Sequence, residues 1–240
     1  MEDIYSFEFL KALFDEMSGS YDRVNYVTSF GFSWRFRRQF VGHANLEPGH
    51  AVCDLMCGRG ECWPFILERI GEGRLVALDL SPGMLEGAHE RRRRLAGRAV
   101  EVREGNALAT GLADNSMDRV LIAFGLKTLA PELREGLAAE LFRVVRPGGV
   151  VSLIEMSEPR GWALRPVFMW YLKRVVPVLG RLLLGNPHNY RMLGVYTERF
   201  QGCEPVVEVM RAAGFDAGLV SYFHGCATGV VARKPPGEDL

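Results

Sequence analysis

The sequence lacks net charge, because its 29 lysine and arginine residues are matched by 29 aspartate and glutamate residues. Without an overall positive field, we expect no nucleic-acid partner. Long uncharged apolar runs are also missing. The nearest, 162–184, contains four basic residues and two prolines, so we predict no transmembrane segment. The acidic N-terminus lacks the basic and then apolar pattern of a signal peptide, which predicts a cytoplasmic protein.

Cysteine is scarce and shows no pairing pattern. The chain has five cysteines, an odd number, and no C-x-x-C motif. This usage is typical of reduced thiols, and we predict neither a disulfide framework nor a metal site. With 240 residues, of which 48% are hydrophobic, the chain can form one domain with a sizeable core, which we place at 1–240.

A third glycine is missing at the most informative position. A short apolar run contains Asp54 and leads into a turn with Gly58 and Gly60, and Trp63 stands where the dinucleotide fingerprint G-x-G-x-x-G has its last glycine. Acids lie at both ends of this turn, Asp54 and Glu61. They would repel a pyrophosphate and attract an amine or a sulfonium.

A second apolar run, 74–79, ends at Asp79 about twenty residues further on. An acid at the end of the second strand of a doubly wound sheet can accept both hydroxyls of a ribose. The two runs therefore predict a nucleoside cofactor with a cationic end. The pattern D-x-x-C-G-x-G over 54–60 resembles motif I of the class I S-adenosylmethionine-dependent methyltransferases.

Apolar runs and helical patterns alternate along the rest of the chain. We predict strands at 51–56, 74–79, 99–103, 118–124, 149–156, 217–223 and 227–232, and helices at 4–17, 61–71, 82–96, 131–145 and 204–213. This order is typical of an α/β doubly wound, seven-stranded, mostly parallel sheet with a Rossmann-like methyltransferase fold. We expect an N-terminal helical segment, 1–45, and a helical cap, 160–200, inserted after strand five.

Further motifs narrow the resemblance to one family. They are YDRVN (21–25), SFG (29–31), WR (34–35), DLSPGML (79–85), FGL (124–126), RPGG (146–149) and NYRML (189–193). In this order they resemble the ubiquinone and menaquinone biosynthesis C-methyltransferase family. The resemblance implies an enzyme that transfers methyl from S-adenosylmethionine to carbon of a small, ring-bearing, apolar metabolite.

One departure keeps the acceptor open. Family members have G-L-R-N after strand four, whereas this chain has Gly125, Leu126, Lys127 and Thr128. O- or N-methylation of another small metabolite is therefore the alternative, and a non-enzymatic scaffold that keeps only the fold is a third reading.

The cofactor residues follow from chemistry and from the motif. Asp54 is expected to bind the amine of the methionine moiety, Gly58 and Gly60 to allow close approach, and Asp79 to bind the ribose. The remaining candidates are Met84 and the pair Asn106 and Ala107 at the adenine, Phe124 at the sulfonium end, and Tyr21, Cys57 and Leu80.

The catalytic candidates are residues that could orient or deprotonate an acceptor. We assign Lys127, His188, Tyr190 and Tyr21, with Glu155 and His224 as further candidates at the strand ends. In the cap, we expect His188, Tyr190 and Arg191 to face the acceptor. The aromatic residues of the cap, among them Trp162, Phe168, Trp170 and Tyr171, could line the pocket or touch a membrane surface, and a homodimer stays open.

Overall fold

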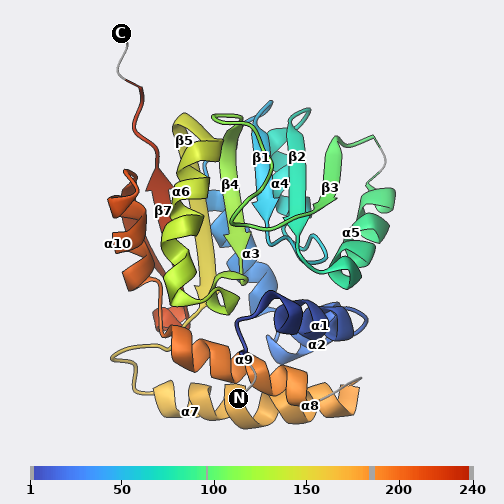
Figure 1. Ribbon diagram of the computed structural model, residues 1–240. Coiled ribbons are helices and arrows are strands. Elements are labelled where there is room, and N and C mark those ends of the chain that lie inside the picture. Colours follow the sequence, from blue (N-terminus) through green and yellow to red (C-terminus); the bar gives the residue numbers. More distant parts are fainter. Residues whose placement is uncertain (1–2, 96, 184–186, 238–240) are drawn as a thin grey trace.

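The central element is a seven-stranded sheet of order β3-β2-β1-β4-β5-β7-β6 (Figure 1). The computed structural model describes residues 3–95, 97–183 and 187–237. Neighbouring strands run parallel, except that β7 is antiparallel to both β5 and β6. This confirms the predicted fold class. The strands are β1 (Ala51–Leu55), β2 (Arg74–Asp79), β3 (Val100–Glu104), β4 (Met117–Ala123), β5 (Val145–Met156), β6 (Asp216–Tyr222) and β7 (Ala227–Arg233).

The strand order reverses between β1 and β4, which pair in parallel with Asp54 opposite Leu121. Both strands are almost fully buried because helices cover both faces of the sheet. In such a sheet, ligands bind beyond the carboxyl ends of the strands at this switch point. The loops that follow β1 and β4 are therefore positioned to form the site.

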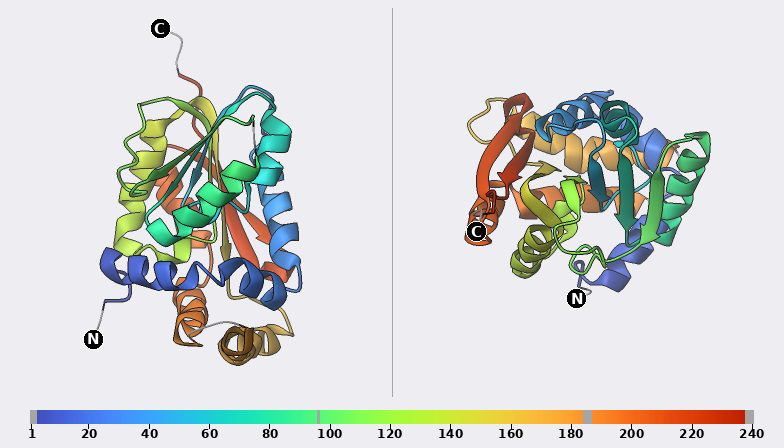
Figure 2. Two further views of the ribbon diagram at one scale, coloured as in Figure 1. Left: turned by 90° about the vertical axis from the view of Figure 1, so that its right-hand side faces the viewer. Right: turned by 90° about the horizontal axis from the view of Figure 1, so that it is seen from above.

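Helices form a layer on each face of the sheet (Figure 2). Helices α3 (Phe32–His43), α4 (Trp63–Ile70) and α5 (Pro82–Arg94) pack on one face, and α6 (Arg134–Val144) and α10 (Glu204–Ala212) on the other. Helix α5 begins where it does because Ser81 accepts a hydrogen bond from the Met84 N–H, and Pro82 suits the first turn.

A third helical layer lies beyond the carboxyl ends of the parallel strands (Figure 1). It contains α1 (Phe7–Met17) and α2 (Tyr21–Thr28) from the N-terminal segment, and α7 (Arg165–Trp170), the π-helical η3 (Tyr171–Val175), α8 (Val176–Leu183) and α9 (Pro187–Phe200) from the insert. The two segments share one apolar cluster, which includes Leu10, Met17, Val24, Tyr190 and Tyr196. None of the described helices is long and apolar enough to cross a membrane.

The predicted boundaries differ from the structure after β4. The predicted helix 131–145 begins as a 3-10 turn, η2 (Pro131–Leu133), and continues as α6, while another 3-10 turn, η1 (Leu126–Thr128), precedes it. Strand β5 starts at Val145, before the Pro-Gly-Gly turn, with a register shift against β4. At Gly149 a Cβ would lie 2.9 Å from the Asp118 carbonyl oxygen, so only glycine lets the two strands approach here.

Candidate functional site

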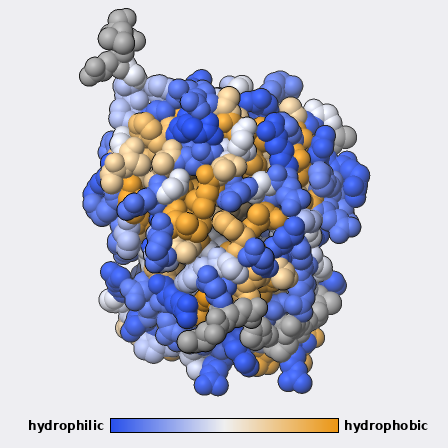
Figure 3. Space-filling model, viewed as in Figure 1, coloured by the Kyte–Doolittle hydropathy of each residue, from blue (hydrophilic) through white to orange (hydrophobic). Residues whose placement is uncertain are grey.

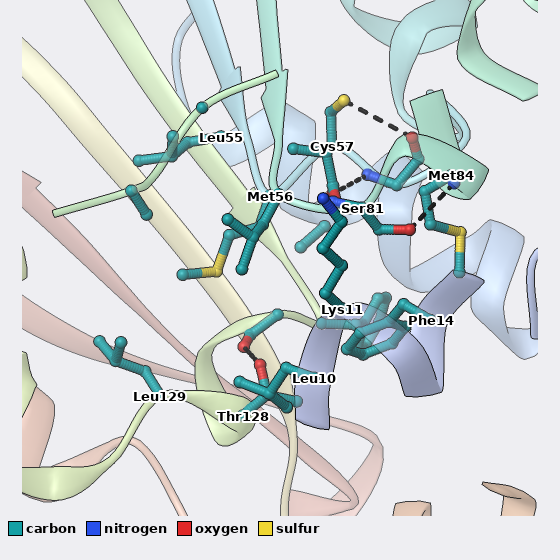
Figure 4. Close-up of a pocket in the computed structure, with 18 of the residues that line it drawn as sticks. Leu10, Lys11, Phe14, Leu55, Met56, Cys57, Ser81, Met84, Thr128 and Leu129 are labelled. Carbon is teal, nitrogen blue, oxygen red and sulfur yellow. Dashed lines mark hydrogen bonds between the residues drawn. The ribbon is translucent and has the colours of Figure 1, made fainter. Parts of the chain in front are cut away.

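A cavity lies at the carboxyl ends of β1 to β4 (Figure 4). Its walls come from the turn after β1, the ends of β2 and β3, the loop after β4, and helices α1, α2 and α3. The predicted cofactor residues that line it are Tyr21, Cys57, Gly58, Asp79, Leu80, Met84, Asn106, Ala107 and Phe124. Asp54 and Gly60 are not among the residues that line it.

The glycine turn is tight because two of its residues have left-handed backbone conformations, with φ of 55° at Gly58 and 80° at Gly60. A Cβ on Gly60 would lie 2.5 Å from the indole ring of Trp63. The tryptophan that replaces the third glycine of the fingerprint therefore packs directly on the turn. The third glycine of the fingerprint allows close packing of helix against strand, and the indole occupies that place here.

Asp54 lies behind the cavity wall, with only 2% of its surface exposed. Its Oδ2 accepts a hydrogen bond from Nε1 of Trp63 at 3.0 Å. Burial and the nearby Glu61 carboxylate raise the pKa of Asp54 well above its usual value. The Oδ2 of Asp54 thus fixes Trp63, and the predicted contact between Asp54 and a cofactor amine stays a prediction.

Glu61 and Arg37 face the cavity where Asp54 was expected. Arg37, on α3, is 5% exposed and stacks over the Phe124 ring at 4.9 Å, and its Nη2 lies 4.0 Å from Glu61 Oε1. Neither Arg37 Nε nor Glu61 Oε1 has a hydrogen-bond partner among the described residues. Burial raises the pKa of Glu61, and Arg37 opposes that rise. Two buried groups of opposite charge, each with an atom that lacks a hydrogen-bond partner among the described residues, suit an amino acid, which carries both an amine and a carboxylate.

Asp79 closes β2 on the opposite side of the glycine turn. Its carboxylate accepts the Gly58 N–H at 2.7 Å and the Ser81 N–H at 3.0 Å. Burial raises the pKa of Asp79 to about 6, although both backbone bonds act against the rise. The Asp79 carboxylate therefore lies in the cavity wall. With a pKa of about 6 it is mostly ionised at neutral pH, and it can accept hydrogen bonds from ribose hydroxyls.

Helix α1 forms a wall that the sequence motifs did not indicate. Leu10, Lys11 and Phe14 face the cavity from α1, across from Ser81 and Met84 (Figure 4). The helix is held there by Asp15 Oδ1, which accepts the Ser81 hydroxyl at 2.6 Å and the Gly83 N–H at 2.8 Å. The apolar spacing of α1 was visible in the sequence, but its partner was not.

A second, largely apolar cavity of about 260 Å³ adjoins the first. Tyr21 and Phe124 line both cavities and form the boundary between them. Its other walls come from α2, α3, the insert helices and the turn before β7: Asn25, Thr28, Ser29, Phe30, Phe32, Ser33, Phe36, Lys127, Met156, Phe168, Tyr171, Leu172, Val176, Leu193, Thr197, Phe223 and Cys226. Phe124 has a φ of 64°, so a left-handed backbone directs this ring between the two cavities.

Lys127 gives the second cavity a cationic group. Its Nζ lies 2.6 Å from Glu155 Oε1 and donates to the Phe124 carbonyl at 3.2 Å, and its backbone N–H donates to Glu155 Oε2 at 3.0 Å. Lys127 is 5% exposed and Glu155 0%. An ammonium has three donors, so one N–H remains for an acceptor in the cavity. Glu155 acts on this site through Lys127.

Tyr21 is the first residue of α2 and the polar group shared by the two cavities. Burial, and then the Glu61 carboxylate, raise the pKa of its phenol. Tyr21 therefore stays a neutral hydroxyl, able to donate a hydrogen bond, and is unsuited to act as a phenolate base at neutral pH.

The predicted arrangement of the cap residues needs correction. Tyr190 is 2% exposed, bonds the Ser20 hydroxyl at 2.6 Å and lies in the apolar cluster beneath α1 and α2, so it faces neither of the two cavities. Arg191 is exposed. His188 lies in the first turn of α9, but its side chain is outside the described residues. His224 stacks on Trp162 at 5.5 Å and is not among the residues that line the second cavity.

Among the described residues, no group of three or more His, Cys, Asp or Glu side chains is arranged to hold a metal ion. The charged side chains that line the two cavities are Lys11, Arg37, Glu61, Asp79 and Lys127, and the Tyr21 hydroxyl lies between them. Such a set can bind an amino-acid nucleoside beside an apolar molecule that presents one oxygen.

Known proteins of the same kind match nearly the whole chain. The model of the ubiE/COQ5 methyltransferase family matches residues 3–235. A demethylmenaquinone methyltransferase of Geobacillus stearothermophilus is 30% identical over 217 residues, which are 90% of this chain and 92% of that protein. Another, from Lactiplantibacillus plantarum, is 34% identical over 210 residues, 86% of this chain and 87% of that protein.

Solved structures agree on the fold. The crystal structure of a SAM-dependent methyltransferase from Aquifex aeolicus superposes with a TM-score of 0.58 at 23% identity, covering 82% of this chain and 88% of that one. Phosphoethanolamine N-methyltransferase 2 of Haemonchus contortus, solved with S-adenosyl-L-methionine, gives a TM-score of 0.62 at 15% identity, covering 84% of this chain and 53% of that one.

Proposed function

The chain belongs to the ubiE/COQ5 methyltransferase family and is an S-adenosylmethionine-dependent methyltransferase, and from this premise we propose that it methylates a ring carbon of a demethylmenaquinone-type quinol. The observation that carries the proposal is the pair of adjoining cavities separated by Tyr21 and Phe124. The first has groups for an amino-acid nucleoside. The second is apolar, apart from Lys127 and a few hydroxyls and an amide, as an apolar ring with phenolic oxygens requires.

The cofactor supplies an electrophilic methyl group, which passes to the ring carbon while the sulfur keeps the bonding electron pair. A quinol becomes nucleophilic at carbon when a phenolic oxygen loses its proton to solvent. After methyl transfer, the ring carbon loses its hydrogen as a proton, the proton ends on the ring oxygen, and the aromatic ring is restored. The task of the protein is therefore to favour a phenolate and to align its ring carbon with the methyl group.

Lys127 performs the first part of this task in our proposal. Its ammonium, held by Glu155 and the Phe124 carbonyl, donates its remaining N–H to the phenolate oxygen and stabilises the charge there. Tyr21 and Phe124, at the boundary of the two cavities, restrict the acceptor ring to the position next to the methyl group. Because the Lys127 ammonium is paired with Glu155, it acts as a hydrogen-bond donor and not as a base. In this role Lys127 supplies the positive charge that the arginine supplies in the family motif.

The proposal is tested with a demethylated naphthoquinol that carries a short prenyl chain, kept reduced with dithionite, and labelled S-adenosylmethionine. We expect labelled product only from the reduced ring, with the label on carbon by mass spectrometry and NMR. Label on oxygen would favour the alternative, O-methylation. Absence of product from a protein that binds S-adenosylmethionine would refute the quinol as the acceptor.

Cofactor affinity should depend on pH through Asp79. Its pKa of about 6 in the unbound protein means that the carboxylate form dominates above pH 6 and is lost as the pH falls. Because the carboxylate accepts the ribose hydroxyls, lowering the pH from 7 to 5 should raise the Kd for S-adenosylmethionine about tenfold. Calorimetry across this range measures the effect. Asp79→Asn should flatten the profile near pH 6, and an unchanged slope in that variant would show that another group titrates.

Arg37 is expected to hold the carboxylate of the methionine moiety. Arg37→Met should raise the Kd for S-adenosylmethionine about tenfold, because a charged hydrogen bond in a buried position is lost. The control ligand is 5′-methylthioadenosine, which lacks the amino-acid end, and its Kd should change less than twofold. Equal weakening of both ligands would mean that Arg37 only braces the cavity.

A further inference from the structure

The segment 160–183 carries an excess of positive charge, although the net charge of the whole chain is zero. It contains five basic residues and no aspartate or glutamate, against 29 residues of each sign in the whole sequence. Arg165 pairs with Glu158, and Lys173 lies 2.6 Å from Glu198. Arg174 and Arg181 are exposed and form no ion pair with the described residues. This segment therefore presents a local positive field to solvent.

The same segment exposes large apolar side chains at helical spacing. Val167 is 59% exposed, Trp170 59%, Val178 56% and Leu182 75%. They lie on the continuous helical stretch α7–η3–α8, three, eight and four residues apart, with Arg174 and Arg181 along the same course. We call this surface the α7–α8 outer face. Hydrophobic and hydrophilic residues both reach the lower margin of the molecule, where α7 and α8 lie (Figure 3).

The inner side of this stretch lines the second cavity. Phe168, Tyr171, Leu172 and Val176 face the cavity, while the outer face lies at the surface. Phe30, in the turn after α2, is 76% exposed, and its ring lies 5.8 Å from that of Tyr171. Exposed apolar groups therefore border the cavity on both the α2 side and the insert side.

We propose that the α7–α8 outer face docks on an anionic lipid bilayer, so that an apolar acceptor passes from the bilayer into the second cavity. Only the identity of the acceptor rests on the proposed function. The docking itself is argued from the charge and the exposed apolar side chains of this surface. An exposed tryptophan with valine and leucine beside unpaired arginines is the composition of a helix that lies in a membrane interface. Arginines there gain from negative headgroups, and the apolar side chains gain from burial in the acyl boundary.

Charge argues against a second copy of the chain as the occupant. In a two-fold symmetric interface, the same patch meets itself. The outer face would then place unpaired arginines against arginines, with no acid of the segment to compensate. An anionic bilayer supplies the missing negative charge.

Vesicle co-sedimentation tests the docking without any acceptor. The full chain should bind vesicles of phosphatidylcholine with 30% phosphatidylglycerol at least about tenfold more tightly than pure phosphatidylcholine vesicles. Arg174→Gln with Arg181→Gln should weaken binding to the anionic vesicles about twentyfold, since each charge near the surface contributes about fivefold. Trp170→Ser with Leu182→Ser should weaken it to a similar extent, because apolar burial is lost.

Two control variants match these changes elsewhere on the surface. Arg93→Gln with Arg94→Gln removes the same charge from the exposed end of α5, and Leu219→Ser removes an apolar residue, 45% exposed, from β6. Both should bind like the unaltered protein. Equal weakening by the Arg93/Arg94 variant would show a non-specific attraction, and absence of vesicle binding would overturn the proposal.

A dimer that dissociates in the Trp170/Leu182 variant, seen by sedimentation velocity, would assign this face to a second copy instead. Methylation of a short-chain acceptor in detergent-free solution separates the two proposals. It should be unchanged in the Arg174/Arg181 variant, and its loss in that variant would overturn the assignment of these arginines to lipid alone.

Discussion

Replacing Lys127 by methionine is expected to lower kcat/KM for the quinol at least about a hundredfold while leaving the Kd for S-adenosylmethionine within about twofold. The side chain keeps a similar length, but the donor to the phenolate oxygen disappears, and loss of one such donor costs about 3 kcal/mol of transition-state stabilisation. The cofactor is bound by other residues, since Lys127 lines the second cavity and not the first. Stopped-time assays with labelled cofactor measure the rate, and calorimetry measures the affinity.

Stability must be separated from catalysis in this variant. Glu155 is 0% exposed and would lose its ion-pair partner, which destabilises a fold by about 3–5 kcal/mol. Lys127→Arg is the matched variant, because it keeps the cation and restores the arginine of the family motif. It should retain activity within about tenfold of the unaltered protein.

The pH profile provides a readout that a merely structural role would not change. Without the ammonium, the phenol of the bound quinol ionises at higher pH, so the rising limb of the rate profile should move up by about one unit or more in Lys127→Met. A profile that keeps its position, together with a lowered melting temperature, would contradict the assignment of Lys127 to the phenolate.

The sheet could be predicted from local patterns because its signals are local. The strands read as short apolar runs, and Gly58, Gly60 and Asp79 occupy fixed positions relative to β1 and β2. Of these three, Gly58 and Asp79 line the first cavity, whereas Gly60 does not. The same reasoning placed the start of strand β5 four residues late, because Val145 pairs with β4 across a shift in register that no local pattern shows.

The partner of each buried charge could not be read from the sequence. Asp54 was assigned to the cofactor because it lies at the end of a strand, but the sequence did not show that its Oδ2 accepts a hydrogen bond from Trp63, nine residues away. Arg37 and Glu61 meet only because α3 packs beside the glycine turn. Tyr190 was assigned to the acceptor from its motif, yet its hydroxyl bonds Ser20, 170 residues earlier. These pairings depend on how helices pack, which no local pattern encodes.

Replacing Asp79 by alanine is expected to weaken the binding of S-adenosylmethionine by about 2 kcal/mol, or roughly thirtyfold, because hydrogen bonds from the ribose hydroxyls to a carboxylate are lost. The effect should be equal for S-adenosylhomocysteine, since both ligands contain the same ribose. Binding of 5′-methylthioadenosine should weaken as well in Asp79→Ala, whereas Arg37→Met should leave the affinity for this ligand almost unchanged. Calorimetry with the three ligands therefore assigns Asp79 and Arg37 to opposite ends of the cofactor.

The control for Asp79→Ala is Glu101→Gln. Glu101 lies on β3, its side chain is 46% exposed and it pairs with Arg103, which does not line the cavity, so its replacement removes a nearby charge without touching the cavity. Its ligand affinities should stay within about twofold. Asp79→Ala also leaves the Gly58 and Ser81 N–H groups without their acceptor. If that loosened the turn rather than removing a ribose contact, Asp79→Asn, which keeps one acceptor oxygen, would bind all three ligands as tightly as the unaltered protein. Full affinity in Asp79→Asn would thus contradict the ribose assignment.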